Sequence, residues 1–287
     1  MKTRIISGIV MGVIVAGVLA LGFLWHPVII TLAIALLAGG AAYEMVHNAA
    51  GIKSVAANVA TVVFSFCAVF SLDFDRGYAT FLLNKLFGIS GNVVLKVYLP
   101  FALGIFYFMF AVCVVLKNHR DFGLGQIGML CGMVFPLCFA FNCLNLVIRH
   151  QNGLYYLLLM FVFSSVCDMG AYFTGVSIGK HKLCPEISPK KTVEGAIGGI
   201  VSSMVFAIVL MLFFNREPVQ IIATAVFTIP LCIVGMLGGL FASAIKRSVQ
   251  LKDYGNLIPG HGGIMDRLDS MLLIAPLLYV LIVVGLV

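Results

Sequence analysis

The sequence has little charge, because only 10% of its 287 residues are Asp, Glu, Lys or Arg, whereas 62% are hydrophobic. Soluble domains carry about 25% charged residues, so this composition excludes a soluble globular fold. It predicts instead an α-helical protein that crosses a membrane many times. Between the apolar runs no segment is long enough to form a separate soluble domain.

The sequence also lacks paired cysteines, internal repeats and low-complexity tracts. Its eight cysteines are scattered, and the absence of a CxxC pair argues against a disulfide framework or a zinc site. Without duplicated halves, a transporter built from inverted repeats is less favoured. The formal net charge of +7 forms no basic stripe on a soluble fold, so we expect no nucleic-acid partner.

Apolar runs occupy most of the chain, and a membrane helix needs about 20 such residues. Nine candidate spans are 5–24, 28–43, 55–72, 98–116, 124–147, 154–178, 193–214, 219–245 and 270–287. We predict an all-α polytopic fold that forms one membrane domain. Its spans 1–5 lie in residues 1–150, and spans 6–9 form a catalytic region in residues 151–287.

Charge bias predicts the orientation of these spans. With a cytoplasmic N-terminus, thirteen lysine and arginine residues fall on the inner side and five on the outer side. Because positive residues favour cytoplasmic loops, the loops 179–192 and 246–269 are predicted to face the cytoplasm, where nucleotides are found. We therefore expect a multi-pass protein of the inner (cytoplasmic) membrane.

Asp168 is the first candidate site residue, and it lies inside the sixth predicted span. An unpaired carboxylate within a membrane costs several kcal/mol, so such a residue usually faces a polar cavity. Ser164 and Tyr172 are expected on its helical face, while Gly170 and Gly175 allow a neighbouring helix to approach. A role in an active cavity is favoured over the alternative, a hydrogen bond that only packs helices.

The loop 179–192 combines a turn-forming pair with two cations. It ends in Ser188, Pro189, Lys190, Lys191 and Thr192. Thr192 is expected to cap the following helix, with Glu194 in its first turn. The amides of that helix N-terminus and the two lysines could bind an anion. The alternative is a normal helix cap beside ordinary cytoplasmic lysines.

The loop 246–269 gathers many of the chain's few charges around a glycine turn. Its charged and titratable residues are Lys246, Arg247, Lys252, Asp253, His261, Asp266, Arg267 and Asp269. The turn at 259–263 could expose several backbone N–H groups to one anion. Oxygens from Asp253, Asp266 and Asp269 could hold Mg²⁺ together with substrate phosphates.

Each of these residues also has a simpler interpretation. Lys246 and Arg247 would complement the dipole at the end of the preceding helix, and one aspartate could cap the following helix. His261 is a candidate phosphate contact or general acid, with a structural histidine as the alternative.

Together the two loops resemble the phosphatidate cytidylyltransferase (CDP-diacylglycerol synthase) family. The family's last motif runs S-x-x-K-R, K-D-x-G, P-G-H-G-G and D-R-x-D. This chain supplies Ser243, Lys246-Arg247, Lys252-Asp253, Gly255, Pro259-Gly260-His261-Gly262-Gly263, Asp266-Arg267 and Asp269. A similar upstream block contains Asp168, Ala171-Tyr172, Gly179-Lys180, Ser188 to Thr192 and Glu194-Gly195. The resemblance is strong over residues 165–287, whereas the N-terminal half is similar only in hydropathy.

The resemblance implies that CTP and phosphatidic acid react at the bilayer to give CDP-diacylglycerol and pyrophosphate in phospholipid biosynthesis. It implies a Mg²⁺ cofactor and leaves open a second, monovalent cation and a homodimer. The implied catalytic residues are Asp266, Lys252, Asp253 and His261, with Asp266, Asp253 and Asp269 at the metal. The implied substrate-binding residues are Asp168, Ser188, Lys190, Lys191, Lys246, Arg247, Gly262, Gly263 and Arg267.

The chain departs from the family pattern at one place. The family reads G-D-L-x-E-S before its K-R pair, but here Gly239 and Ala242 replace the two acids. Asp168, Asp253 or Asp269 could substitute for the missing metal ligand, activity could be low, or the chain could bind lipid and nucleotide without catalysis. Another lipid-phosphate transferase, such as a polyprenol kinase-like protein, and an anionic-metabolite transporter are the remaining alternatives.

Overall fold

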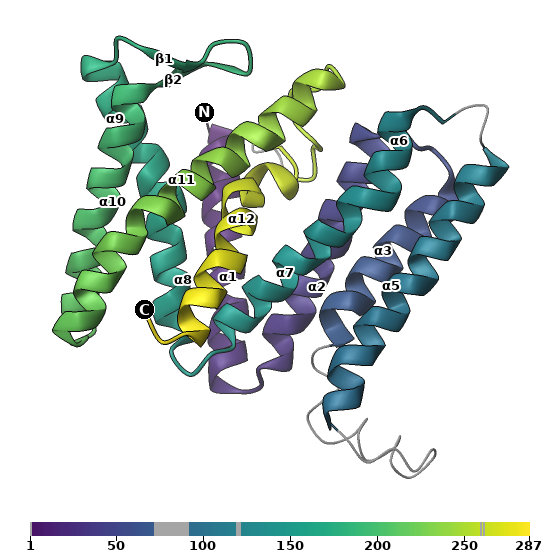
Figure 1. Cartoon of the computed structure of the whole chain (residues 1–287), viewed down its shortest axis with the longest axis horizontal. Helices are drawn as coiled ribbons and strands as arrows, with labels where there is room; N and C mark the ends of the chain where they lie inside the picture. The colour runs from purple at the N-terminus through teal and green to yellow at the C-terminus, as the bar shows by residue number, and fades with distance from the viewer. Residues whose placement is uncertain (1, 72–91, 119–121, 259, 261) are drawn as a thin grey trace. The chain divides into compact units, whose positions relative to one another are not determined.

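The computed structural model describes residues 2–71, 92–118, 122–258, 260 and 262–287, and of these 2–5 and 92–100 as backbone only (Figure 1). The chain folds as two compact helical units. The first comprises Met1–Asn145 and Asp253–Asp266, and the second comprises Leu146–Lys252 and Arg267–Val287. The sequence-based division at residue 150 differs, because the segment Asp253–Asp266 packs with the N-terminal unit.

Six helices in the described residues are long and apolar enough to cross a membrane, so the chain is a multi-pass α-helical membrane protein. They are Ile6–Leu24, Val28–Ala49, Leu124–Ile148, Gly153–Ile178, Val193–Phe213 and Pro218–Ser248. Two shorter apolar helices, Val55–Phe70 and Phe101–Lys117, coincide with the third and fourth predicted spans. The total of nine spans and the cytoplasmic N-terminus stay predictions.

The first unit is built from helices that pack around an aromatic core. Its elements are α1 (Lys2–Leu24), α2 (Val28–Tyr43), η1 (Glu44–Ala49), α3 (Val55–Phe70), α5 (Asn92–Lys117), α6 (Leu124–Gly128), η3 (Met129–Met133) and the start of α7 (Val134–Ile148). Phe64 of α3 stacks on Tyr107 of α5 with ring centroids 4.4 Å apart. The Tyr107 hydroxyl donates to the Leu130 carbonyl at 2.9 Å, which satisfies its polar end within the apolar core.

The second helix is longer than the sequence predicted. Residue 43 was the expected end, but the backbone continues through η1, a π-helical turn that begins at Glu44. Single π-helical turns widen a helix and often occur at functional sites. The extension therefore brings a carboxylate into a helix that the sequence analysis treated as apolar.

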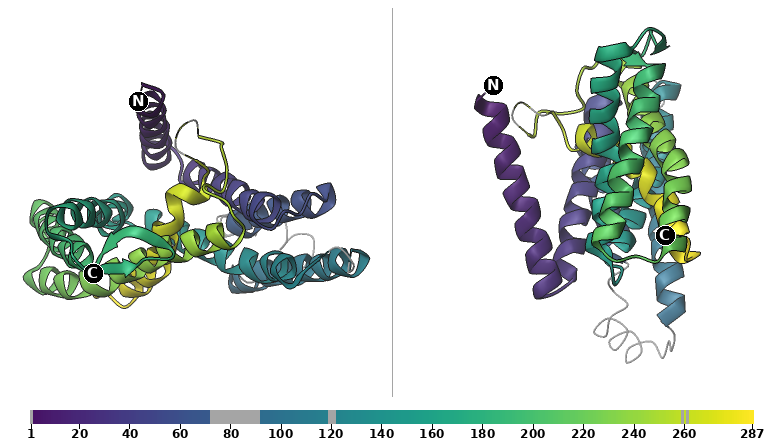
Figure 2. Two further views of the ribbon diagram at one scale, coloured as in Figure 1. Left: turned by 90° about the horizontal axis from the view of Figure 1, so that it is seen from above. Right: turned by 90° about the vertical axis from the view of Figure 1, so that its left-hand side faces the viewer.

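The second unit is formed by helices and one small hairpin. Its elements are the end of α7, α8 (Gly153–Phe161), η4 (Val162–Val166), α9 (Cys167–Ile178), β1 (Lys182–Cys184), β2 (Ser188–Thr192), α10 (Val193–Phe213), α11 (Pro218–Ser248) and most of α12 (Met265–Val283). Figure 2 shows α9 and α10 side by side, with the hairpin joining them at one end.

Glycines let α9 and α10 approach closely, as the sequence predicted for Gly170 and Gly175. A Cβ atom on Gly175 would lie 2.8 Å from the Thr192 hydroxyl oxygen, and one on Gly195 would lie 2.6 Å from the Ala171 carbonyl oxygen. Small residues are enriched where membrane helices pack because they allow the backbones to meet.

Gly195→Ala should therefore destabilise the protein by about 1–3 kcal/mol, because the added methyl group meets backbone that cannot move aside easily. The thermal unfolding midpoint in detergent measures this effect. Gly17→Ala is the control, since a Cβ atom at Gly17 in α1 meets nothing within 4 Å. Equal midpoints for the two variants would contradict the close packing of α9 on α10.

The hairpin corrects the expected position of the turn in residues 179–192. Lys182 pairs with Thr192 and Cys184 with Ser188 in an antiparallel register, so the turn lies at residues 185–187. The predicted turn at Ser188 and Pro189 was wrong, because these residues begin β2. Proline is tolerated there because every strand of a two-stranded sheet is an edge strand.

Candidate functional site

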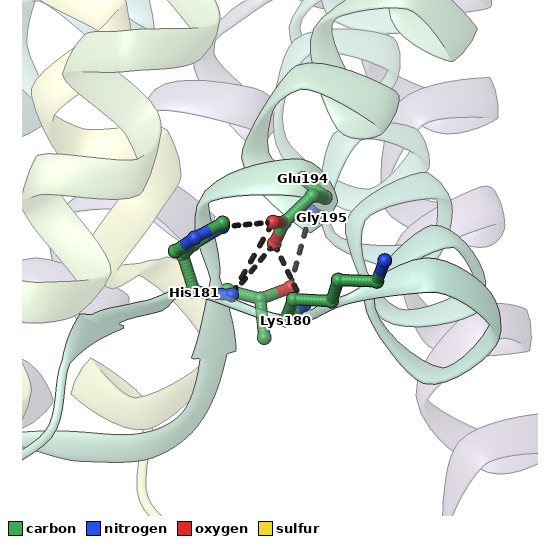
Figure 3. Close-up of polar contacts among 5 residues, drawn as sticks. Lys180, His181, Glu194 and Gly195 are labelled. Atoms are coloured by element: carbon green, nitrogen blue, oxygen red, sulfur yellow. Dashed lines mark hydrogen bonds and ion pairs between the residues drawn. The ribbon is translucent and has the colours of Figure 1, made fainter.

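Protein groups cap the N-terminus of α10. Thr192 is the cap, as predicted, and its hydroxyl oxygen accepts a hydrogen bond from the Gly195 amide at 3.1 Å. The Glu194 carboxylate accepts bonds from the amides of Lys180 and His181, at 3.1 and 3.2 Å (Figure 3). Glu194 also lies 2.6 Å from the imidazole Nδ1 of His181. These contacts fasten the loop after α9 to the start of α10.

Two backbone amides at the start of α10 therefore already donate hydrogen bonds within the protein. The Val193 amide donates to the His181 carbonyl at 2.9 Å, and the Gly195 amide is bound by the cap. Binding of an anion at the N-terminus of α10 would therefore depend more on the lysine side chains than on the helix amides that the sequence suggested.

The β2 strand separates the two lysines that the sequence treated as a pair. Successive side chains of a strand point to opposite faces. Lys190 is exposed, whereas Lys191 is half-buried. Lys191 is therefore the lysine that β2 directs towards the helices of its own unit.

Four charged residues form a polar cluster in the second unit, which we name the Asp168 cluster: Asp168, Lys191, Lys246 and Asp269. Lys191 attracts the Asp168 carboxylate, and Lys246 attracts that of Asp269. The two carboxylates are also close enough to repel each other. Asp168 is exposed and the other three are half-buried, so a ligand could reach the cluster.

The positions of Asp269 and Asp168 depend on the helices that carry them. Asp269, in the first turn of α12, accepts bonds at Oδ1 from the Ser270 amide at 2.7 Å and the Ser270 hydroxyl at 3.2 Å. Asp168 lies in α9 just after the π-helical turn η4. That turn breaks the expected i, i+4 spacing, since Ser164 is buried whereas Tyr172 is 65% exposed. The shared face predicted with Ser164 was therefore wrong, whereas Asp168 and Tyr172 are both exposed and four residues apart within α9.

Gly239, where the family pattern has an acid, lies beside this cluster. A Cβ atom on Gly239 would be 3.2 Å from the Ser270 hydroxyl oxygen and 3.6 Å from the Lys191 ammonium nitrogen. A carboxylate at position 239 would therefore stand against Lys191. Ala242, the other replaced position, is 1% exposed and offers no ligand atom.

The donor atoms of the cluster restrict how it could hold Mg²⁺. Within the described residues, no three His, Cys, Asp or Glu side chains are placed to bind a metal together. Mg²⁺ is usually bound by one or two carboxylates plus substrate phosphates. Asp168 and Asp269 fit this arrangement, in which phosphate oxygens complete the coordination. The predicted set of Asp253, Asp266 and Asp269 stays a prediction; Asp266 and Asp269 lie three residues apart at the start of α12.

The glycine turn belongs to the first unit, and its backbone is tightly folded, as predicted. Gly260 and Gly262 have φ angles of +77° and +83°, which favour glycine. The Ile258 amide donates to the Gly262 carbonyl at 2.9 Å. Asp266 Oδ2 accepts bonds from the amides of Tyr254 and Gly263 at 2.7 and 3.0 Å. The Asp266 carboxylate therefore binds the Gly263 amide, one of those that the sequence suggested for a substrate anion.

Glu44 is a site residue that the sequence analysis missed. Its two carboxylate oxygens accept bonds from the Ile264 and Met265 amides, each at 3.0 Å. The signal was present, because an ionisable residue inside a membrane helix is a functional candidate by default. The sequence analysis missed Glu44 because it ended the second span at residue 43 and so placed Glu44 outside the helix.

The structure places the remaining predicted residues as follows. Ser188 is half-buried at the start of β2, and Arg247, Lys252, Asp253 and Arg267 are exposed. His261 and Pro259 lie outside the described residues. Lys191 and Lys246 bring the hairpin and the end of α11 to the same cluster, whereas Asp253 to Asp266 forms part of the first unit.

Comparison with known proteins finds one family across the chain. The profile of the family described as "Cytidylyltransferase family" matches residues 2–284. The chain is 43% identical over 171 residues to the phosphatidate cytidylyltransferase of Bacillus subtilis, covering 59% of this chain and 62% of that protein. It is 47% identical over 133 residues to that of Staphylococcus haemolyticus, covering 46% and 51%.

The matched part thus spans about half to three fifths of the length of these curated relatives. The family profile also extends well beyond residues 165–287, into the half where the sequence analysis found a similarity only in hydropathy. Because the profile runs through nearly all of this sequence, the chain belongs to the cytidylyltransferase family.

Proposed function

We propose that this chain is a phosphatidate cytidylyltransferase of the cytoplasmic membrane. It transfers the cytidylyl group of CTP to phosphatidic acid and releases pyrophosphate, forming CDP-diacylglycerol for phospholipid synthesis. The family membership and the relatives named phosphatidate cytidylyltransferase support the reaction. The observation that carries the proposal is the Asp168 cluster, which gathers two cations and two carboxylates in a helical membrane protein.

In the reaction, a phosphate oxygen of phosphatidic acid attacks the α-phosphorus of CTP. The bond from that phosphorus to the oxygen bridging the α- and β-phosphates breaks, and pyrophosphate leaves. Such transfers depend on positioning and charge, and they need little covalent chemistry from the protein. Lys191 and Lys246 would offset the repulsion between the two polyanions and stabilise the charge on the phosphate oxygens.

Mg²⁺, when bound, would neutralise phosphate oxygens and polarise the phosphorus under attack. Asp168 and Asp269 are the carboxylates of the second unit that could hold it. In the first unit, Asp266 Oδ2 accepts hydrogen bonds from the amides of Tyr254 and Gly263 and so shapes the loop that contains the glycine turn.

The decisive assay uses purified protein with radiolabelled CTP, phosphatidic acid and Mg²⁺ in mixed micelles. We expect CDP-diacylglycerol to form only when all three are present. Binding of CTP without turnover would favour a non-catalytic relative, as the glycine at 239 suggests. Flux of an anionic metabolite across proteoliposomes without CDP-diacylglycerol would favour a transporter. Transfer of phosphate to a polyprenol would favour a kinase-like enzyme.

Gly239→Asp tests whether the missing acid limits the metal site. The new carboxylate would stand between Ser270 and Lys191, beside the two existing carboxylates of the cluster. We expect the Mg²⁺ concentration for half-maximal activity to fall by about 10-fold, because each ligand strongly affects metal affinity. Gly239→Asn is the control, since it has the same size without the charge. No change with aspartate, or an equal change with asparagine, would mean that no ligand is missing.

A further inference from the structure

Glu44 is a buried carboxylate in an apolar helix of the first unit. It is 4% exposed and lies within the membrane-compatible helix Val28–Ala49. A carboxylate in such a place needs hydrogen-bond donors to offset its desolvation. Its donors are the amides of Ile264 and Met265, at the start of α12. The side chain of one helix therefore caps the N-terminus of another, where negative charge is favourable.

A second contact joins the same helix to the same loop. The Asn48 side-chain amide, one turn beyond Glu44 in η1, donates to the Tyr254 carbonyl at 2.6 Å. Tyr254 is fully buried. Both ends of the loop between Tyr254 and Met265 are thus held by one π-helical turn.

The position of Glu44 explains why residues 255 and 263 of the loop are glycines. A Cβ atom on Gly255 would lie 2.6 Å from Glu44 Oε1, and one on Gly263 would clash with both carboxylate oxygens of Glu44. Gly263 also donates its amide to Asp266. Gly263 therefore contacts both the Glu44 carboxylate and that of Asp266, which the family resemblance implies is catalytic.

We propose that Glu44 is a positioning residue for the transferase reaction, a role that rests on the proposed function. Together with Asn48 it holds the two ends of the loop, at Tyr254 and at Ile264–Met265, so that the neighbouring Asp266 carboxylate keeps a fixed geometry. Preorganised groups accelerate a reaction because they need not be ordered at the moment of transfer. Glu44 itself touches no substrate in this proposal and acts through the loop.

Hydrogen–deuterium exchange tests the positioning directly and needs no substrate. Glu44→Ala should speed exchange in peptides that cover residues 254–265 by at least about 10-fold, because local opening then requires fewer broken contacts. Glu44→Gln should give an intermediate rate, because the Ile264 and Met265 amides bind different carboxylate oxygens and glutamine replaces one of these oxygens with an NH2 group, which cannot accept a hydrogen bond. Asn48→Ala should also speed exchange of this loop, but by less than Glu44→Ala. It provides a second probe if Glu44→Ala fails to fold.

Thr31→Val is the matched control for a buried polar group in the same helix. The Thr31 hydroxyl donates to the Asn145 side chain at 3.1 Å, and both residues are fully buried away from the loop contacts. This variant should leave exchange of the loop unchanged. An equal effect of Thr31→Val and Glu44→Ala would mean that Glu44 only supports the fold, which would overturn the proposal.

Steady-state kinetics measures kcat, which would not change if Glu44 only stabilised the fold. We expect Glu44→Ala to lower kcat by about 10- to 100-fold, as for other residues that orient a reacting group, with KM for CTP changed by less than about threefold. Unchanged loop exchange and kcat in Glu44→Ala would refute the positioning role. If the wild-type protein forms no CDP-diacylglycerol, the proposed function fails instead, and the exchange data still decide whether Glu44 orders the loop.

Discussion

Asp266→Ala should reduce cytidylyl transfer by about 100- to 1,000-fold while the protein still inserts and folds. The substitution removes a carboxylate proposed to act at the phosphates, where loss of one stabilising group costs about 100- to 1,000-fold. It also releases the amides of Tyr254 and Gly263, which Asp266 Oδ2 now accepts. Turnover is measured with saturating CTP and phosphatidic acid, and membrane extraction with the same detergent checks folding.

Asp266→Asn separates the two effects. Asparagine keeps an oxygen that can accept the loop amides but has no negative charge. If the charge is needed at the phosphates or the metal, Asp266→Asn should be as inactive as Asp266→Ala. Near wild-type activity of Asp266→Asn would show that Asp266 only holds the loop, and Asp269 and Asp168 would then be the remaining candidates for the metal.

Lys191→Ala is expected to lower kcat/KM for CTP by about 100-fold, the second-largest effect. Lys191 attracts Asp168 and lies next to Gly239, so its removal leaves the two carboxylates of the cluster with one cation fewer. The cluster would then repel phosphates more strongly. Initial rates at low CTP concentration measure the change.

Lys190→Ala is the matched control, because it removes the same charge from the adjacent residue of β2. Lys190 is exposed on the opposite face of the strand, so we expect an effect of less than about threefold. Equal losses in the two variants would indicate that the lysines act only through the net charge of the hairpin.

The sequence predicted the helical character of the chain well, because the signal is carried by composition and by runs of apolar residues. The starts and ends of α3, α10, α11 and the continuous helix Gly153–Ile178 lie within a few residues of the predicted spans. The Thr192 cap was also predicted, since capping depends on residues close in sequence. The π-helical turn at Glu44 was missed, and its hydrogen bonds are to residues far along the chain. The hairpin at residues 182–192 was also missed, although its strand pairing is local.

The candidate site could be predicted as a set of residues but not as an arrangement. The charged residues of two loops could be recognised because charge is scarce in this chain. Their grouping could not, because Asp168, Lys191, Lys246 and Asp269 meet only when α9, β2, α11 and α12 pack together. The predicted metal set of Asp253, Asp266 and Asp269 stays a prediction.

The sequence by itself determined that the chain is a helical membrane protein with phosphate-binding residue types, since hydropathy and local motifs need no tertiary contact. Only the tertiary structure decided which groups those residues meet. It placed Glu44 on the amides of Ile264 and Met265, 220 and 221 residues away, and turned Lys191 rather than Lys190 towards Asp168. Hydrogen bonds and charge contacts act over a few ångströms, so their partners are fixed by the packing of distant segments and not by spacing along the chain.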